Sequence, residues 1–290
     1  MLFSAVRHEV SFWHGHDRLN GALLMPEAPG PHPVLVMVRD PHHRERDYSG
    51  WLEPLADAGI ASFSWDRSRC GSDPGDAARA VPHRAREVLS AVERLRLLPE
   101  LDARAVAVMG SGEGGWAAAQ ATTYSHQLAA LILACTPVAA PADGGYDPRP
   151  TVSGVTVPVL ALFGEQDPLV PLEESVRGVR AALRGGDHVD HEVAVVRGAD
   201  HGLRVRAPHG LGPIVDGMHR FGEWPVGLTR LVAEWLHRRL RPDGVPAFAP
   251  PLQPAAVRFP RSPRPRAGHA PPTLPTPVPV RQVRRHVSWA

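Results

Sequence analysis

The sequence predicts an α/β fold in which helices flank a mostly parallel sheet. Two patterns lead to this prediction: short apolar runs alternate with helical patterns after residue 31, and the residues before that point form a predicted hairpin. Each apolar run has five to seven residues, which is typical of strands buried on both faces of a parallel sheet. The six runs are Val34–Val38, Ile60–Trp65, Ala105–Met109, Leu128–Ala134, Val157–Phe163 and His191–Val196.

The predicted hairpin consists of two apolar-rich segments, Val6–Trp13 and Leu19–Met25. The residues between them, His14-Gly15-His16-Asp17, are of the types that turns favour. An opening hairpin followed by repeated strand–helix units is the order expected of this fold class.

Apolar residues at helical spacing predict helices between these strands and after them. The positions are Tyr48, Trp51, Leu52 and Leu55, then Ala85, Val88, Leu89, Val92 and Leu95, and finally Leu228, Leu231, Val232, Trp235 and Leu236. Parallel sheets bind ligands at the carboxyl ends of their strands, so we expect the functional residues directly after the apolar runs.

Composition divides the chain into a predicted core domain, residues 1–240, and a tail, residues 241–290. The core has 24 arginines and 29 acidic residues, a net charge of −5, whereas the tail has eight arginines, one acidic residue and a net charge of +7. Thirteen of the 32 prolines lie in the tail, which therefore has little apolar surface to bury and is predicted to be disordered. Its charge could attract nucleic acid, but the chain has no base-reading motif, so we expect no nucleic-acid partner.

Cysteine and histidine usage predicts neither disulfides nor a metal site. Cys70 and Cys135 are too few for a disulfide framework. Histidine pairs occur at His14 and His16 and at His42 and His43, but among 16 histidines no ligand spacing recurs. Without a membrane-length apolar run or an export signal, the sequence predicts a soluble cytoplasmic protein with no membrane partner and no cofactor.

The run that ends at Met109 leads into the glycine-rich segment Gly110-Ser111-Gly112-Glu113-Gly114. Small residues between a strand and a helix permit the sharp turn G-x-S-x-G, which presents a nucleophile at the top of the sheet. With Gly110 first and Gly114 last, the nucleophile position falls on Gly112, which has no side chain.

The chain resembles α/β-hydrolases of the bacterial esterase and dipeptidyl-aminopeptidase-like type. The resemblance extends from Val6 to Leu240 and includes a G-x-x-D-x-x-V-P pattern that begins at Gly164 and a D-H-G segment. It implies an α/β-hydrolase fold with an eight-stranded, mostly parallel sheet, and it assigns the acid to Asp167 and the base to His201. The short segment 136–156 leaves room for little or no cap domain.

The departures from the family lie around the expected oxyanion site. Where the family has an H-G motif, this chain has Arg39-Asp40-Pro41, and a proline has no N–H to donate to an oxyanion. Glu113 adds a negative charge to the elbow, and the later D-x-R-G-x-G pattern is altered at Ser68 and Arg69.

Three function classes follow. The first is an acid/base enzyme for elimination, cyclisation or isomerisation of a small organic substrate, with His201 as base or acid oriented by Asp167. The second is an inactive relative that binds a ligand or partner and keeps the pair as a relic. The third is a hydrolase with an unorthodox nucleophile such as Ser111. The sequence favours the first class, because an intact Asp–His pair opposite a glycine leaves space for a substrate.

Overall fold

The structure is a computed structural model that describes residues 5–39, 52–66, 77–141, 145–188, 190–205, 214–215, 218–219, 223–240 and 257–258. Asp40, Pro41, the pair His42 and His43, and Cys70 lie outside these residues, as does the tail apart from Val257 and Arg258. The predicted disorder of the tail and the predicted domain boundary at residue 240 therefore stay predictions.

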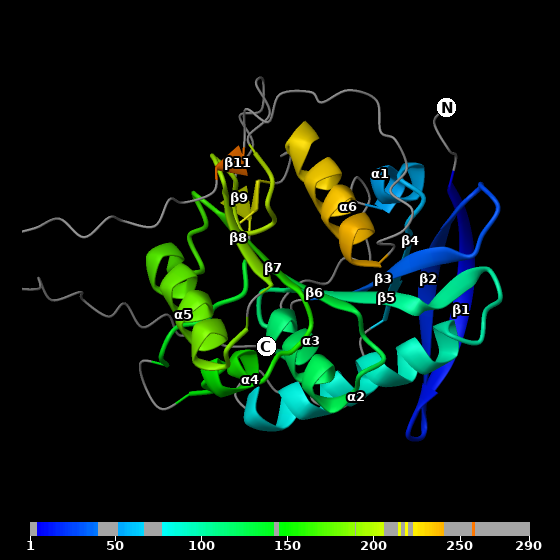
Figure 1. Ribbon diagram of the computed structural model, residues 1–290, viewed down its shortest axis with the longest axis horizontal. Helices are drawn as coiled ribbons and strands as arrows, with labels where there is room; N and C mark the ends of the chain where they lie inside the picture. The colour runs from blue at the N-terminus through cyan, green and yellow to red at the C-terminus, as the bar shows by residue number, and fades with distance from the viewer. Residues whose placement is uncertain are drawn as a thin grey trace, which may run out of the picture. The chain divides into compact units, whose positions relative to one another are not determined.

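Nine of the described strands form one large sheet, and most of its neighbouring strands are parallel (Figure 1). The order across the sheet is β1-β2-β4-β3-β5-β6-β7-β8, with the short strand β11 paired to β8. Pairing is parallel from β4 to β8 and antiparallel for β1 with β2, β2 with β4, and β8 with β11. The bounds are β1 Ala5–His14, β2 Asp17–Pro26, β3 His32–Val38, β4 Ala61–Trp65, β5 Leu101–Ser111, β6 Ala130–Ala134, β7 Val159–Gly164, β8 His191–Val196 and β11 Val257–Arg258. The predicted eight-stranded sheet is confirmed, and β11 adds a ninth strand that the sequence did not predict.

Helices cover both faces of the sheet (Figure 1). Helices α2, α3, α4 and α5 lie on one face, and α1 and α6 lie on the other. Their bounds are α1 Leu52–Asp57, α2 Ala77–Leu95, α3 Gly114–Tyr124, α4 Arg149–Ser153, α5 Leu172–Gly185 and α6 Val226–Leu240. A separate two-stranded sheet joins β9 (Ile214–Val215) to β10 (Met218–His219). Between β6 and β7 the described residues contain only α4, which agrees with the expected lack of a cap domain.

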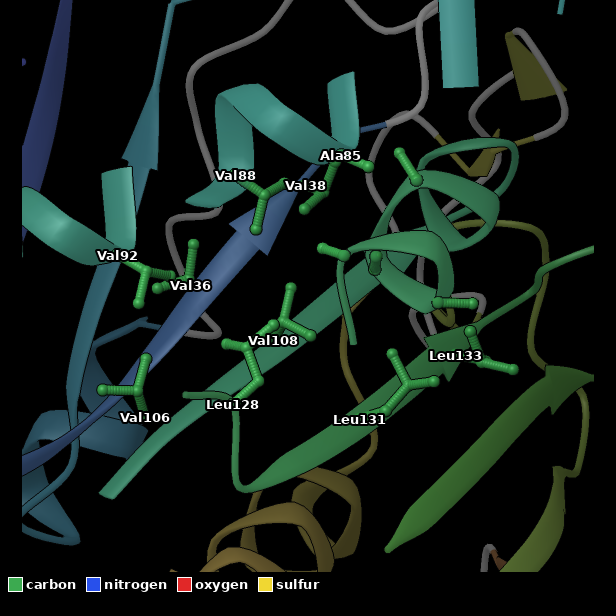
Figure 2. Close-up of a cluster of buried hydrophobic side chains, with 14 of the residues drawn as sticks. Val36, Val38, Ala85, Val88, Val92, Val106, Val108, Leu128, Leu131 and Leu133 are labelled. Carbon is green, nitrogen blue, oxygen red and sulfur yellow. The ribbon is translucent and has the colours of Figure 1, made fainter. Parts of the chain in front are cut away.

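The central strands are buried on both faces, as their apolar runs predicted. In β3, Val34, Val36 and Val38 belong to the core under α2 and α3, whereas Leu35 and Met37 belong to the core under α1 and α6. Figure 2 shows the first of these cores, where Val88 and Val92 of α2 lie over Val36 and Val38 of β3. Each fully buried side chain of this kind contributes about 1.5–3 kcal/mol relative to an exposed one, so the sheet provides a rigid base for the residues at its carboxyl edge.

The N-terminal hairpin is confirmed. Its register runs from Ala5 opposite Pro26 to His14 opposite Asp17, and Gly15 in the two-residue turn has φ +59°. Phe12 packs edge-on against Phe63 and Trp65 of β4, so the hairpin is anchored to the rest of the sheet.

Within the described ranges, no helix combines the length and apolarity that crossing a bilayer requires.

Candidate active site

The predicted elbow is a two-residue turn between β5 and α3. Strand β5 ends at Ser111, helix α3 begins at Gly114, and Gly112 between them has φ +52°. The Gly112 N–H donates to the carbonyl of Ala134 on the neighbouring strand at 2.9 Å. The turn therefore has the tight geometry that presents one residue at the strand end, and Gly112 occupies that place.

Close packing explains the other glycines of the elbow. A Cβ atom at Gly110 would overlap the backbone of Gly114 and Gly115, and one at Gly114 would lie 2.5 Å from the carbonyl oxygen of Arg39. The same Arg39 carbonyl accepts a hydrogen bond from the guanidinium of Arg84 on α2. The backbone that follows β3 thus lies beside the elbow, as expected for the oxyanion region, although Asp40 and Pro41 are outside the described residues.

The remaining predicted residues of the elbow have different places. Ser111 is half-buried and is the last residue of β5, in register with Ala134 of β6. Glu113 is half-buried and stands at the N-cap position of α3, where its dihedral angles are helical, φ −66° and ψ −20°. Ser111 therefore belongs to the strand, and the left-handed position of the turn belongs to Gly112.

Asp167 lies in the turn after β7, and backbone amides fix its carboxylate. Its Oδ1 accepts hydrogen bonds from the N–H of Leu169 at 2.8 Å and of Val170 at 3.1 Å. Its Oδ2 accepts a third from Nδ1 of His201 at 2.8 Å. The side chains of His201 and Asp167 are only 5% and 2% exposed, so the pair is shielded from bulk water.

Hydrogen bonds from within the loop and from Trp224 hold the loop that carries His201. Asp200 Oδ1 accepts hydrogen bonds from the N–H of Gly202 at 2.9 Å and of Arg204 at 3.0 Å. Trp224 donates its indole N–H to the carbonyl of Gly202 at 3.0 Å, and the Arg204 guanidinium lies 4.3 Å from the centre of its ring. His201 is therefore presented by an ordered loop.

The acid turn and the histidine loop are also joined to each other. The Gln166 N–H donates to the carbonyl of Ala199 at 2.8 Å, and Glu165 accepts from the Gly198 N–H at 2.9 Å. Gly164 lies so close to this loop that a Cβ atom would be 2.6 Å from the Ala199 carbonyl oxygen. These contacts keep Asp167 and His201 in register although 34 residues separate them.

Cys135, directly after β6, joins this cluster, which the sequence did not predict. Potential ligand atoms of Cys135, Asp167 and His201 all lie within 4.8 Å of one another, and among the described residues they form the one such group that could hold a metal ion. Complete burial, and next the charge of Asp167, raise the pKa of the Cys135 thiol well above its ordinary value. In the sequence, the one sign of a site role for Cys135 was its place directly after a predicted strand. Small buried residues without such a role are also found at that place.

The comparison with protein families decides the assignment, because the Dienelactone hydrolase family matches residues 19–215, which include the elbow, the acid turn and the histidine loop. The chain belongs to the dienelactone hydrolase family. This family is part of the α/β-hydrolase superfamily, so the predicted resemblance is confirmed. No curated protein matches the chain significantly by sequence.

Solved structures of hydrolases share the fold of this family member. A dienelactone hydrolase from Anabaena variabilis is 19% identical with a TM-score of 0.58, and the match covers 82% of this chain and all of that one. A dienelactone hydrolase-like promiscuous phosphotriesterase from metagenomic libraries is 19% identical with a TM-score of 0.62, covering 81% of this chain and 99% of that one. The 2,6-dihydroxy-pseudo-oxynicotine hydrolase is 19% identical with a TM-score of 0.58, covering 87% of this chain and 72% of that one.

Proposed function

We propose that this member of the dienelactone hydrolase family is an acid/base enzyme for a small organic substrate. In this proposal His201 moves a proton, Asp167 orients it, and Gly112 stands where the superfamily has its nucleophile. The reaction class is elimination, cyclisation or isomerisation, each of which needs a proton removed from one atom and returned to another. The observation that carries the proposal is the 2.8 Å hydrogen bond between two almost fully buried side chains.

The chemistry of the pair follows from the tautomer that Asp167 selects. A carboxylate accepts only, so Nδ1 of His201 donates to it and the basic lone pair resides on Nε2. When Nε2 takes a proton, the negative charge of Asp167 stabilises the imidazolium. General acid–base catalysis by a positioned group of this kind contributes about 10²–10⁴-fold to a rate.

Gly112 supports a mechanism without a covalent intermediate on the elbow. With no side-chain oxygen or sulfur, Gly112 itself offers no nucleophile to an acyl group. In this mechanism His201 deprotonates the substrate directly, with no acyl-enzyme stage.

The names of the family and of its structural neighbours favour one second candidate, hydrolysis by water. In that case His201 would activate a water molecule for attack on an ester or lactone. The family name makes an unsaturated lactone the first substrate class to examine.

The test compares wild type with His201→Gln, Asp167→Asn and Ser111→Ala on a panel of unsaturated lactones and short p-nitrophenyl esters. We expect turnover by wild type and Ser111→Ala, loss of about 10²–10⁴-fold in the other two variants, and no labelling by a fluorophosphonate probe. Product analysis in ¹⁸O-water separates the two candidates, because hydrolysis incorporates the label and isomerisation does not. Loss of turnover on Ser111→Ala together with labelling of Ser111 would overturn the proposal in favour of a serine nucleophile.

A further inference from the structure

Cys135 lies beside both halves of the Asp167–His201 pair. Its side chain is completely buried, and its S–H donates a hydrogen bond to the carbonyl oxygen of Asp200, the residue before His201, which lies 3.9 Å from Sγ. Sγ also lies within 4.8 Å of the carboxylate of Asp167 and of a ring nitrogen of His201. The thiol therefore lies where the acid turn, the histidine loop and the end of β6 meet.

The backbone of Cys135 holds the thiol in this place at a conformational cost. Its φ of +47° is left-handed, a region that non-glycine residues enter rarely. Its N–H donates to the carbonyl of Leu162 on β7 at 2.7 Å, which fixes the residue against the neighbouring strand. A side chain kept in such a conformation beside titratable groups indicates a role for that side chain.

The chemistry of the thiol at this place is that of a hydrogen-bond donor. Burial and the carboxylate of Asp167 both disfavour the thiolate, and they raise the pKa of Cys135. The sulfur therefore keeps its proton and is a poor nucleophile. The S–H donates to the carbonyl of Asp200, while Asp167 accepts two amide N–H groups on Oδ1 and the imidazole N–H on Oδ2.

We propose that Cys135 is a positioning residue: its S–H, donated to the carbonyl of Asp200, ties the end of β6 to the histidine loop and holds Nδ1 of His201 toward Oδ2 of Asp167. Its consequence for catalysis rests on the proposed function, since only a proton-transfer role for His201 makes the orientation of the imidazole matter. The geometric part, the hydrogen bond between the end of β6 and the histidine loop, does not depend on that function.

The test is the NMR signal of the proton shared by His201 and Asp167, which an imidazole–carboxylate hydrogen bond places far downfield. Absence from His201→Gln assigns the signal in the full-length protein. We expect Cys135→Ala to speed exchange of this proton with water by about tenfold or more, as for the loss of one weak hydrogen bond. Cys135→Ser, which restores a donor of similar size, should keep the exchange slow. On any substrate that wild type turns over, Cys135→Ala should lower kcat with little change in KM.

The matched control is Ile132→Val, which removes one methyl group from the same buried cluster on β6. It should lower the melting temperature without changing the downfield signal. An unchanged signal in Cys135→Ala would overturn the proposal, and so would zinc bound one to one by wild type and lost in Cys135→Ala. Because the signal needs no turnover, a protein that is inactive on every substrate but shows the expected NMR changes would contradict the proposed function and leave the positioning role supported.

Discussion

Gly112 has φ +52°, and this angle determines what a side chain would cost there. A non-glycine residue in the left-handed region costs about 1–3 kcal/mol unless surrounding contacts compensate. In the superfamily a nucleophile occupies this strained position, whereas in this chain the position has no side chain. The elbow is thus relieved of conformational strain.

Restoring the side chain with Gly112→Ser should therefore lower the free energy of unfolding by about 1–3 kcal/mol, measured by urea denaturation. Gly15→Ser is the control, since Gly15 has a similar φ of +59° in a turn far along the chain from the site. We expect Gly112→Ser to stay a poor esterase, because loss of one oxyanion donor costs about 10²–10³ in turnover and Pro41 has no N–H. Fast ester turnover by Gly112→Ser would show that the oxyanion site is complete.

In the proposed mechanism Asp167 acts through the tautomer of His201, which predicts a strong effect of Asp167→Asn. An amide can donate to Nδ1 and leave the proton on Nε2, so the ring would lose its basic nitrogen toward the substrate. We expect the free energy of unfolding of Asp167→Asn to lie within about 2 kcal/mol of the wild-type value, and its catalytic rate to be lower by about 10²–10⁴-fold. A rate within threefold of wild type would be inconsistent with orientation by Asp167.

Elements differed in how far the sequence could predict them. The apolar runs of β3 to β8 were recognisable because strands buried on both faces need apolar residues at successive positions. Helix α5 and strand β11 were not predicted: α5 is polar and amphipathic, and the two residues of β11 pair only because the edge of β8 is available. For the site, the order of the motifs along the chain, as in the family it resembles, predicted the pair Asp167 and His201. Cys135 lies beside this pair because β6 pairs with β7, and no local sequence pattern encodes that pairing.

His14 of β1 packs against α2, and a positive charge on its ring destabilises the folded state. His14 contacts Ser90 at 3.0 Å and lies edge-on to His83 at 4.9 Å. Burial, and next the charge of His83, lower the pKa of His14. The unfolded chain therefore binds the proton more readily than the folded one, so stability is present above the ordinary value of 6.5 and is lost as the pH falls below it.

We accordingly expect wild type to have a lower free energy of unfolding at pH 5.5 than at pH 7.5, and His14→Gln to show a smaller difference. His16→Gln is the matched control, because His16 is exposed in the same hairpin turn. Urea denaturation at the two pH values measures the effect. An identical pH dependence in wild type and His14→Gln would contradict it.

At the scale of the whole molecule, the edge of the sheet at β8 is covered by two residues of the tail. Val257 and Arg258 of β11 pair with Val196 and Val195. An uncovered edge strand offers its N–H and C=O groups to other chains, which favours association. The tail thus contributes a specific contact to the sheet as well as charge.

Two truncations should separate these contributions. Deletion of residues 261–290 is expected to leave the melting temperature unchanged, because all described elements lie before residue 260. Deletion of residues 241–290 also removes β11 and should leave a folded core that self-associates more readily, as measured by light scattering. A core that unfolds after the shorter deletion would contradict the predicted disorder of the tail.

Each central strand contributes alternate side chains to the two cores on opposite faces of the sheet, as in β3. Neither core can therefore unfold without exposing strands against which the other core also packs. Backbone amides of β3, β5 and β6 should consequently exchange with deuterium in one common, slow event, while those of β1, in which five of the ten residues are exposed, exchange earlier through local fraying.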